Sequence, residues 1–343
     1  MTNTNDFYMP PEWLEHERTF ISWPVKTSLI YPDNYELVCD NYASIIRGIS
    51  AYEVVTVIAN EDSLSLAKSL CGDHIEYLVI PHNDAWCRDN GPTFLVNNQG
   101  ERSAVNWNFN AWGEKYLPYD LDNQVAPSIL DHFHISRFDS TIVLEGGSIH
   151  VDGEGTLLTT KECLLNPNRN PSLTQEEIEA ELKERLNISS IIWLEQGLFG
   201  DETDGHVDNV ACFAKPGTIL LQTCSDPNDP NYEISQQHLN VLSQSIDAAG
   251  RSIEIIEIPQ PPARYYEGER LTLSYLNFYF VNNGIILPVF GEDAAQADQV
   301  AIDILSKVFP TRKITPINTS ALITEGGNIH CITQQMPNSL LPQ

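Results

Sequence analysis

Several segments of this chain carry residue types that can do nucleophilic chemistry, and one of them holds a cysteine. Cys331 follows a pair of glycines in TEGGNIHCITQQMP, and glycine allows backbone conformations and close approaches that other residues forbid. A thiol just past such a turn, at the end of an apolar strand, is well placed as a nucleophile. A single cysteine is more often a small buried hydrophobic residue, but the polar neighbours of Cys331 favour a nucleophile.

A histidine alternates with two aspartates in GDETDGHVDN, as Asp204, His206 and Asp208. Alternate side chains of an extended segment share one face, so we expect these three to face the same side. The histidine would then be available for proton transfer. A loop of acids around a hydrogen-bonded histidine and a divalent metal site are the alternatives. Calcium is disfavoured because the EF-hand ligand spacing is missing, and zinc because no second histidine follows at helical spacing.

A tryptophan and an aspartate lie close together in NDAWCRDNGPTF, as Trp86 and Asp89. An aromatic ring can cover the face of a planar cation while a carboxylate binds its edge. The alternative is a tryptophan that packs a loop beside a local pair of Arg88 and Asp89. Glu145, which opens EGGSIH, either joins such a site or is a carboxylate at a strand end in water.

The chain repeats one short motif, EGGSIH at residues 145–150 and EGGNIH at residues 325–330. Val151 follows the first copy and Cys331 the second. We therefore expect one backbone platform to carry an inert side chain once and a thiol the other time. We do not include the glutamate of the second copy, Glu325, in the site. Recurring strand-end motifs in four β/α-type units predict a repeat architecture that closes on itself.

Short runs rich in β-branched and aromatic residues, ending in Gly, Pro or Asn, predict the strands that position these segments. These runs are residues 19–24, 53–59, 75–81, 141–147, 155–160, 210–214, 218–223, 253–259, 276–282 and 284–290. Helical spacing of apolar residues, with capping and stop signals, predicts helices between them. The predicted helices are residues 172–186, 236–250 and 293–309. No long linker divides the chain, although its length alone would allow about two domains.

Composition and charge limit the function classes. Hydrophobic residues make up 42% of the 343 residues, enough for a large core, which excludes a mainly disordered chain. The formal net charge is −28, so nucleic acids and anionic membranes would be repelled while a small cation would be attracted. Seven cysteines without a CxxC pair, no N-terminal signal pattern and no apolar run of about 20 residues predict a cytoplasmic protein.

Several carboxylates beside one cysteine and one histidine favour a cationic target. In a simple cysteine hydrolase they would oppose the negative charge that an acyl substrate develops. A guanidinium is planar and presents five N–H donors, so two aspartates can bind it from two sides and hold its central carbon against a thiolate. The carboxylates should also raise the pKa of the thiol, and the bound cation should offset that increase.

These motifs resemble those of a known family. WCRDNGPTF, LEGGSIH, TDGHVDN and GGNIHCITQQMP, with the opening PPEWLEHERTFISWP, are similar to the agmatine deiminase family over nearly the whole chain. This family is the bacterial peptidyl-arginine deiminase-like branch of the guanidino-modifying enzymes. The resemblance implies an α+β fold, a five-bladed pseudo-symmetric α/β propeller (pentein) of ββαβ repeats. It also implies a single catalytic domain over residues 1–343, with the site at its centre.

The resemblance further implies a reaction and a role for each candidate residue. The reaction, part of polyamine metabolism, is hydrolysis of agmatine to N-carbamoylputrescine and ammonia through a covalent amidino-cysteine intermediate, with no metal or organic cofactor. The implied catalytic residues are the nucleophile Cys331, the acid/base His206, the guanidinium-binding Asp89 and Asp208, and the assisting Glu145. Trp86 would line the pocket. The partner would be a small cationic guanidino compound, and relatives commonly form homo-oligomers.

The choice of substrate stays open between related compounds. The acidic loop from Glu202 to Asp204 could bind the distal amine of agmatine. Peptidyl-arginine would need an open cleft. Free arginine would need a cationic side chain for its α-carboxylate, for which Arg88 and Arg264 are candidates. A non-catalytic guanidine- or polyamine-binding protein of the same fold would keep the carboxylates but could lose the cysteine or the histidine, and both are present.

Overall fold

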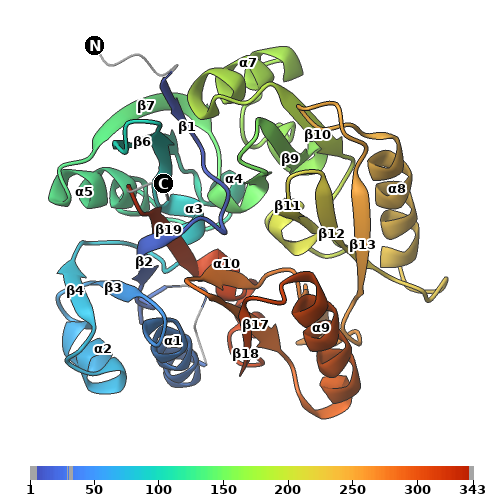
Figure 1. The fold of residues 1–343 in the computed structure, drawn as a ribbon. Coiled ribbons are helices and arrows are strands. Elements are labelled where there is room, and N and C mark those ends of the chain that lie inside the picture. The colour runs from blue at the N-terminus through green and yellow to red at the C-terminus, as the bar shows by residue number, and fades with distance from the viewer. Residues whose placement is uncertain (1–5, 29, 31–33, 340–343) are drawn as a thin grey trace.

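The computed structural model describes residues 6–28, 30 and 34–339; the other positions of the predicted domain lie outside the described residues. Within this described part, the strands form five sheets of three or four strands and one separate two-stranded hairpin. The longer helices lie on the periphery, and the short helices α3 (Cys87–Asn90) and α10 (Ile329–Ile332) lie near the middle of the molecule (Figure 1). The predicted mixed α+β class is confirmed.

The five larger sheets share one pairing pattern. In each, two strands pair antiparallel, and a third strand pairs parallel to one of them after a helix-containing connection. Parallel neighbours need such a crossover, whereas antiparallel neighbours need only a tight turn. The sheets are β1 (Phe7–Tyr8), β5 (Thr93–Asn97), β6 (Arg102–Asn108) and β7 (Ser136–Val143); β8 (Ile149–Val151), β9 (Thr156–Thr160) and β10 (Ser190–Leu194); β11 (Ala211–Lys215), β12 (Thr218–Thr223) and β13 (Glu254–Pro259); β16 (Tyr279–Val281), β17 (Gly284–Val289) and β18 (Lys313–Asn318); and β19 (Thr333–Pro337), β2 (His16–Ser22), β3 (Val54–Ala59) and β4 (Glu76–Val79). The hairpin is β14 (Tyr265–Tyr266) with β15 (Glu269–Arg270).

The two ends of the chain meet in one sheet. The last strand, β19, pairs antiparallel with β2, and Thr333 lies opposite Ile21. Cys331 lies directly before β19, so this pairing ties the cysteine segment to the N-terminal part of the chain. The middle of the molecule is therefore built from segments that are far apart in the sequence (Figure 1).

The longer helices connect the parallel strands. They are α1 (Tyr35–Ser50), α2 (Leu64–Cys71), α5 (Val125–His132), α7 (Gln175–Leu186), α8 (Asn231–Gln244) and α9 (Ala295–Val308). The predicted helices 172–186 and 293–309 are confirmed as α7, which begins with a capping box at Thr174, and α9. The helix predicted over 236–250 is shifted, because α8 ends at Gln244. Gly250, with φ of +81°, lies in a later turn instead.

Three strand predictions need correction. The runs 75–81 and 253–259 are predicted to be buried, but β4 and β13 are the outer strands of their sheets and are largely exposed or half-buried. The run 141–147 ends its strand at Val143, and Gly146–Ser148 forms one turn of 3-10 helix, η3. Glycines weaken strands because they have no side chain to pack, so the Gly-Gly pair leaves the sheet.

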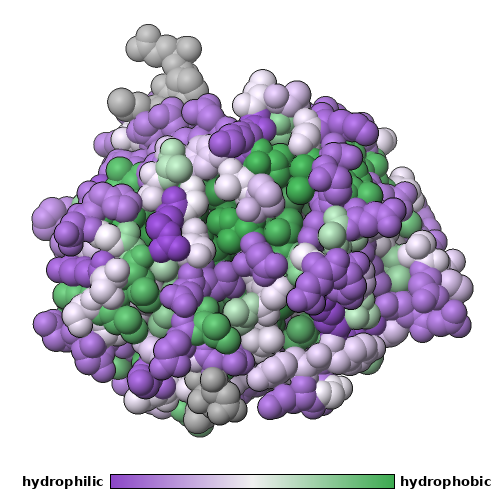
Figure 2. Space-filling model, turned by 90° about the horizontal axis from the view of Figure 1, so that it is seen from below, coloured by the Kyte–Doolittle hydropathy of each residue, from purple (hydrophilic) through white to green (hydrophobic). Residues whose placement is uncertain are grey.

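A core of large side chains supports the middle of the molecule. One buried cluster contains Trp23 and Tyr42 and extends to Trp86, Trp112 and Cys331. Close packing holds such side chains in fixed positions. The face in Figure 2 is mostly hydrophilic, in keeping with the net charge of −28. In the part of the chain that the structure describes, the helices are too short or too polar to cross a membrane.

Candidate active site

Cys331 lies in the short helix α10, and the prediction that it ends an apolar strand is wrong. The turn before it contains Gly326, whose φ is +93°, and Asn328, whose side chain caps the helix. The helix then leads directly into β19. The two copies of the Gly-Gly motif therefore do not share one backbone platform, because the first copy continues into strand β8, where Val151 lies.

The thiol of Cys331 is buried among polar partners. Its Sγ lies 3.7 Å from Oδ2 of Asp208 and 3.2 Å from Nδ2 of Asn277. Asn277 also accepts the backbone N–H of Cys331 at 3.4 Å and donates to Oδ1 of Asn209 at 3.0 Å. Sequence reasoning missed this role, although Asn277 interrupts an apolar stretch. A polar residue inside such a stretch indicates a buried group that must find partners.

Three of the predicted residues meet over one glycine, Gly147 of the first motif. Its backbone N–H donates to Oδ1 of Asp89 at 3.0 Å. A Cβ atom at this position would lie 2.7 Å from Nδ1 of His206, 2.9 Å from Oδ1 of Asp89 and 3.0 Å from Oδ2 of Asp208. Real Cβ atoms do not approach other atoms so closely, so only glycine lets these groups converge.

Asp89 belongs to α3 and is held by a tryptophan that the sequence analysis missed. Nε1 of Trp112 donates to Oδ2 of Asp89 at 2.9 Å. The ring of Trp86, which precedes α3, lies edge-to-face against Trp112 with ring centroids 6.3 Å apart. Both rings line a narrow inner cavity together with Asp89 and Cys331. This cavity can therefore offer an aromatic wall and a carboxylate to a planar group beside the thiol.

Glu145 is fully buried, so the alternative of a strand-end carboxylate in water is wrong. Its Oε1 accepts Nε of Arg169 at 2.6 Å, and its Oε2 lies 3.9 Å from Nε2 of His206. A buried carboxylate needs a paired cation, and Arg169 supplies it. Arg169 lies in the segment NPNRNP, residues 166–171, to which the sequence predictions above assign no role in the site.

Asp204 does not share a face with His206, and the prediction of an extended segment here is wrong. Asp204 has φ of +64° and the next residue, Gly205, has φ of +91°, so the chain turns sharply before the histidine. The Asp204 carboxylate instead pairs with Lys115 at 2.8 Å and with Arg169 at 2.7 Å. These cations and Asn168 lower the pKa of Asp204 against the opposing effect of burial.

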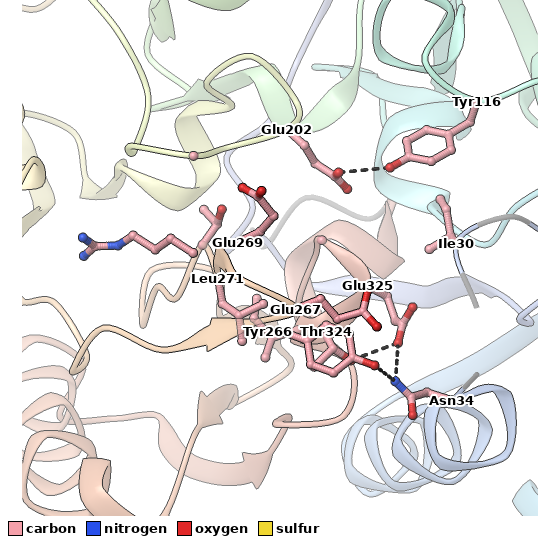
Figure 3. A pocket seen from close by; sticks show the side chains of 15 residues that line it. Ile30, Asn34, Tyr116, Glu202, Tyr266, Glu267, Glu269, Leu271, Thr324 and Glu325 are labelled. Carbon is pink, nitrogen blue, oxygen red and sulfur yellow. Dashed lines mark hydrogen bonds between the residues drawn. The ribbon is translucent and has the colours of Figure 1, made fainter. Parts of the chain in front are cut away.

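A larger, outer cavity of about 500 Å³ opens from the inner one, and Figure 3 shows its lining. Glu202, whose Oε2 accepts the hydroxyl of Tyr116 at 3.0 Å, lines both cavities. Glu325 lines both as well, although the sequence analysis leaves it out. Glu267 and Glu269 line the outer cavity only. The route to the thiol is therefore acidic.

The electrostatics of the site favour a bound cation. Burial raises the pKa of the Cys331 thiol well above its ordinary value, and the carboxylates of Asp208 and Asp89 add to this increase. Burial lowers the pKa of His206, but four neighbouring carboxylates raise it above its ordinary value overall: Asp89, which has the largest effect, Glu145, Asp208 and Asp201. The sulfur is thus mainly a thiol near neutral pH, and the imidazole binds a proton readily. A cation placed among these groups would favour the thiolate.

One group among the described residues has ligand atoms close enough for a metal ion: Glu145, Cys163 and His206, all within 4.8 Å of one another. The Arg169 guanidinium binds Glu145 at the edge of this group. Its positive charge would repel a metal cation, and it already occupies one of the two carboxylate oxygens. The group is therefore better explained as an ion-paired carboxylate beside a buried histidine.

Comparison with known proteins gives the family. Residues 8–337 match the model of the Porphyromonas-type peptidyl-arginine deiminases. The chain belongs to this family. An agmatine deiminase of Stutzerimonas stutzeri is 43% identical over 362 residues, covering 96% of this chain and 95% of that protein. The agmatine deiminase of Enterococcus faecalis has a TM-score of 0.93 at 34% identity, covering 99% of both chains. A substrate-bound agmatine deiminase of C. jejuni has a TM-score of 0.88 at 33% identity, covering 96% of both chains.

In this member of the deiminase family, the two arginines considered for binding an α-carboxylate lie elsewhere. Arg88 donates to the side chain of Gln335 at 2.8 Å, and Arg264 donates to the carbonyl of Gly291 at 2.9 Å. Neither is among the described residues that line the inner or the outer cavity. Arg270 lines the outer cavity, but Asp229 binds its guanidinium through both carboxylate oxygens, at 2.9 and 2.8 Å.

Proposed function

We propose that this chain is an agmatine deiminase, which hydrolyses the guanidinium group to N-carbamoylputrescine and ammonia. One observation carries the proposal: a buried thiol lies 3.7 Å from the Asp208 carboxylate, while Asp89 and His206 converge with Asp208 over Gly147. A narrow aromatic cavity lined by Asp89 and Cys331, with Asp208 beside the sulfur, fits a flat cation whose central carbon is attacked. Family membership supports the same chemistry, since related proteins are named for it.

The reaction begins with nucleophilic attack by Cys331. Asp89 and Asp208 bind the N–H groups of the guanidinium, and the Cys331 thiolate adds to its central carbon to form a C–S bond. His206 donates a proton to one nitrogen, the C–N bond breaks, and ammonia leaves. His206 then takes a proton from water, the water oxygen adds to the amidino carbon, and the C–S bond breaks to release the ureido product. Glu145, anchored by Arg169, favours the protonated form of His206 from 3.9 Å away.

The outer cavity supports agmatine over arginine. The distal ammonium of agmatine would meet the carboxylates of Glu202 and Glu325, where the two cavities join. Burial raises the pKa of both carboxyl groups, and Glu202 raises that of Glu325 further, so a cation beside them would relieve their repulsion. Asp204 is a weaker candidate because Lys115 and Arg169 already pair with it. The α-carboxylate of arginine would meet the same acidic side chains.

The architecture proposed for this function is a single catalytic domain over residues 1–343, built as a five-bladed pseudo-symmetric propeller of ββαβ repeats. Five sheets with one pairing pattern and the closure of β19 onto β2 support it. The partner is a small cationic guanidino compound. A homo-oligomeric state and a cytoplasmic location stay predictions.

The test is ammonia release from agmatine, arginine and an arginine peptide blocked at both ends. We expect kcat/KM for agmatine to exceed that for arginine by about 100-fold, because the arginine carboxylate would lack a matching cation. Cys331→Ala should lower kcat by roughly 10⁴-fold or more. Cys224→Ala, which removes another buried thiol, should keep the activity.

Three other results of this experiment would contradict the proposal. Tight binding of agmatine without ammonia release would make the chain a guanidine-binding protein. Faster release from the peptide than from agmatine would make peptidyl-arginine the substrate. Full turnover by the Cys331→Ala variant would exclude the proposed nucleophile.

A further inference from the structure

The two copies of the Gly-Gly motif end in histidines that converge on one buried carboxylate. Nε2 of His330 lies 2.9 and 3.0 Å from the two carboxylate oxygens of Glu12. Nε2 of His150 lies 3.7 Å from one of the same oxygens. All three side chains are buried, and Glu12 comes from the segment just before β2. The reaction described above uses none of these residues.

His330 also contacts the candidate site directly. Its Nδ1 lies 2.9 Å from Oδ2 of Asp208, the oxygen that lies 3.7 Å from Sγ of Cys331. Both ring nitrogens of His330 therefore face carboxylate oxygens. A neutral imidazole has only one N–H, so both nitrogens can donate only when the ring is protonated. Between two ionised carboxylates, Glu12 and Asp208, this geometry fits an imidazolium.

His150 offers a matched contrast within the same protein. Its Nδ1 accepts the backbone N–H of Phe213 at 3.3 Å, so this nitrogen carries no proton. The ring is therefore neutral. It shares Glu12 with His330 but, among the described residues, it makes no hydrogen bond to Asp208. One motif histidine is thus charged and linked to the site, and the other is neutral and not linked to it.

The charges around His330 balance. Arg88 lies 3.4 Å from Oε1 of Glu12 and donates to the backbone carbonyl of His330 at 3.3 Å. Two cations thus face two carboxylates, Glu12 and Asp208. Burial lowers the pKa of His330 and Arg88 lowers it too, but the two carboxylates raise it above its ordinary value overall. Cys212, whose thiol also faces this group, has a pKa raised by burial and stays neutral.

We infer that His330 is a positioning residue for the deimination, an imidazolium that fixes one oxygen of Asp208 and leaves the other for the substrate. Oδ1 of Asp208 is buried, and no described residue donates to it. A guanidinium N–H is the donor that this oxygen needs, since a buried acceptor without a partner is costly. Glu12 anchors the imidazolium from the far side. The inference rests on the proposed function, because it assumes that Asp208 binds the guanidinium.

The experiment compares His330→Gln with His150→Gln in steady-state kinetics with agmatine over a range of pH. Each variant loses a neutral or charged contact with Glu12, but only His330→Gln loses the cation beside Asp208. We expect kcat/KM of His330→Gln to fall by about 10- to 100-fold, mostly through KM, because a charge-assisted hydrogen bond is lost. The acidic limb of its pH profile should move to higher pH, since the cation that lies 2.9 Å from the Asp208 carboxylate is lost. His150→Gln should keep kcat/KM within about threefold and keep the profile.

A second variant and a spectroscopic measurement keep the inference testable if His330→Gln does not fold. Glu12→Gln removes the anchor charge and should move the acidic limb in the same direction by a smaller amount. In the unmodified protein with ¹⁵N-labelled histidine, the His330 ring should carry protons on both nitrogens at neutral pH, while the His150 ring carries one.

The outcomes separate this inference from the proposed function. Equal kcat/KM and equal pH profiles for the two histidine variants, with an active parent, would overturn the positioning role alone. A parent that releases no ammonia would overturn the proposed function, and the labelled spectrum would then decide whether His330 is an imidazolium. A His330 ring with one proton at neutral pH would overturn the inference in either case.

Discussion

The two copies of the Gly-Gly motif, residues 145–150 and 325–330, differ in one residue but form different backbones. In the first copy the glycines lie in the 3-10 turn η3, and the chain continues into strand β8. In the second, the glutamate ends the 3-10 turn η6 (Ile323–Glu325), Gly326 has φ of +93°, and the chain continues into helix α10. Nearly identical sequence therefore carries Val151 on a strand and Cys331 on a helix.

The second glycines of the two copies have a similar role, whereas the glutamates do not. The second glycine of each motif leaves room for a site group: Gly147 for the polar cluster, and Gly327 for the ring of Trp86. The glutamates differ, because Glu145 is fully buried against Arg169 whereas Glu325 lines the entrance. In the proposed reaction, the first copy thus lies beside the acid/base histidine, whereas the second leads to the nucleophile and makes room for the ring of Trp86. The two copies therefore have different parts in the proposed site.

The largest effect that distinguishes the copies is expected from adding one methyl group to each second glycine. Gly147→Ala would push apart His206, Asp89 and Asp208, and we expect kcat for agmatine to fall by about 100-fold or more, because small displacements of reacting groups are costly. Gly327→Ala would place a Cβ 2.2 Å from the Trp86 ring, so its main effect should be a higher KM. Steady-state kinetics with agmatine measures both.

The control for these variants is Gly48→Ala in α1. Its Cβ would meet mainly the flexible end of the Ile317 side chain, at 2.7 Å, so it adds the same methyl far from the cavity. Its kinetics should match those of the parent. A Gly147→Ala variant with unchanged kcat would show that the convergence over this glycine does not matter for turnover.

A smaller contrast is expected between the two glutamates. Glu145→Gln removes one of the two carboxylates that pair with Arg169, and the same carboxylate raises the pKa of His206. We expect kcat to fall by about 10- to 100-fold with little change in KM, and the protein to lose about 3 kcal/mol of unfolding free energy. Glu325→Gln should instead raise KM for agmatine by about fivefold and leave kcat unchanged. Kinetics and denaturant unfolding of both variants measure this, and equal effects of both substitutions on kcat would contradict the division of roles.

Sequence reasoning identified the residues that meet in the site but not the backbone that brings them together. Cys331, His206, Asp89 and Asp208 were found from their residue types and from the resemblance of their motifs to the family, and the structure places Asp89, His206 and Asp208 around Gly147. Asp204 failed because alternation assumes an extended chain, and a positive φ at Asp204 breaks it.

Other residues escaped sequence reasoning because their partners are distant in the chain. Trp112 binds Asp89, Arg169 binds Glu145 and Asn277 contacts Cys331, all across segments that only the fold brings together. The strands of the fold were likewise only partly predictable from the sequence. Buried apolar runs such as β9, β12 and β17 were predictable from their composition, whereas β18 and β19 contain prolines and polar residues and take their strand conformation from their neighbours.

The smallest expected effect concerns the ionisation of a thiol at each of the two motif positions. In the free protein, burial and the carboxylates of Asp208 and Asp89 hold the pKa of Cys331 above its ordinary value of about 8.5, so thiolate absorbance should appear only at alkaline pH. A bound guanidinium inhibitor should lower this pKa by about one pH unit or more, because the cation favours the thiolate. Difference spectra against Cys331→Ala isolate this sulfur from the other cysteines.

The control is a thiol at the matching position of the first copy, made by Val151→Cys in the Cys331→Ala background. This thiol lies on β8 rather than on α10. Its pKa should also be high from burial, but the inhibitor should leave it unchanged, because the proposed cation lies against Asp208 and Cys331 rather than against Val151. An inhibitor that lowers both values equally, or neither, would show that the cation does not sit against Cys331, and the division of roles between the two motif copies would lose its electrostatic basis.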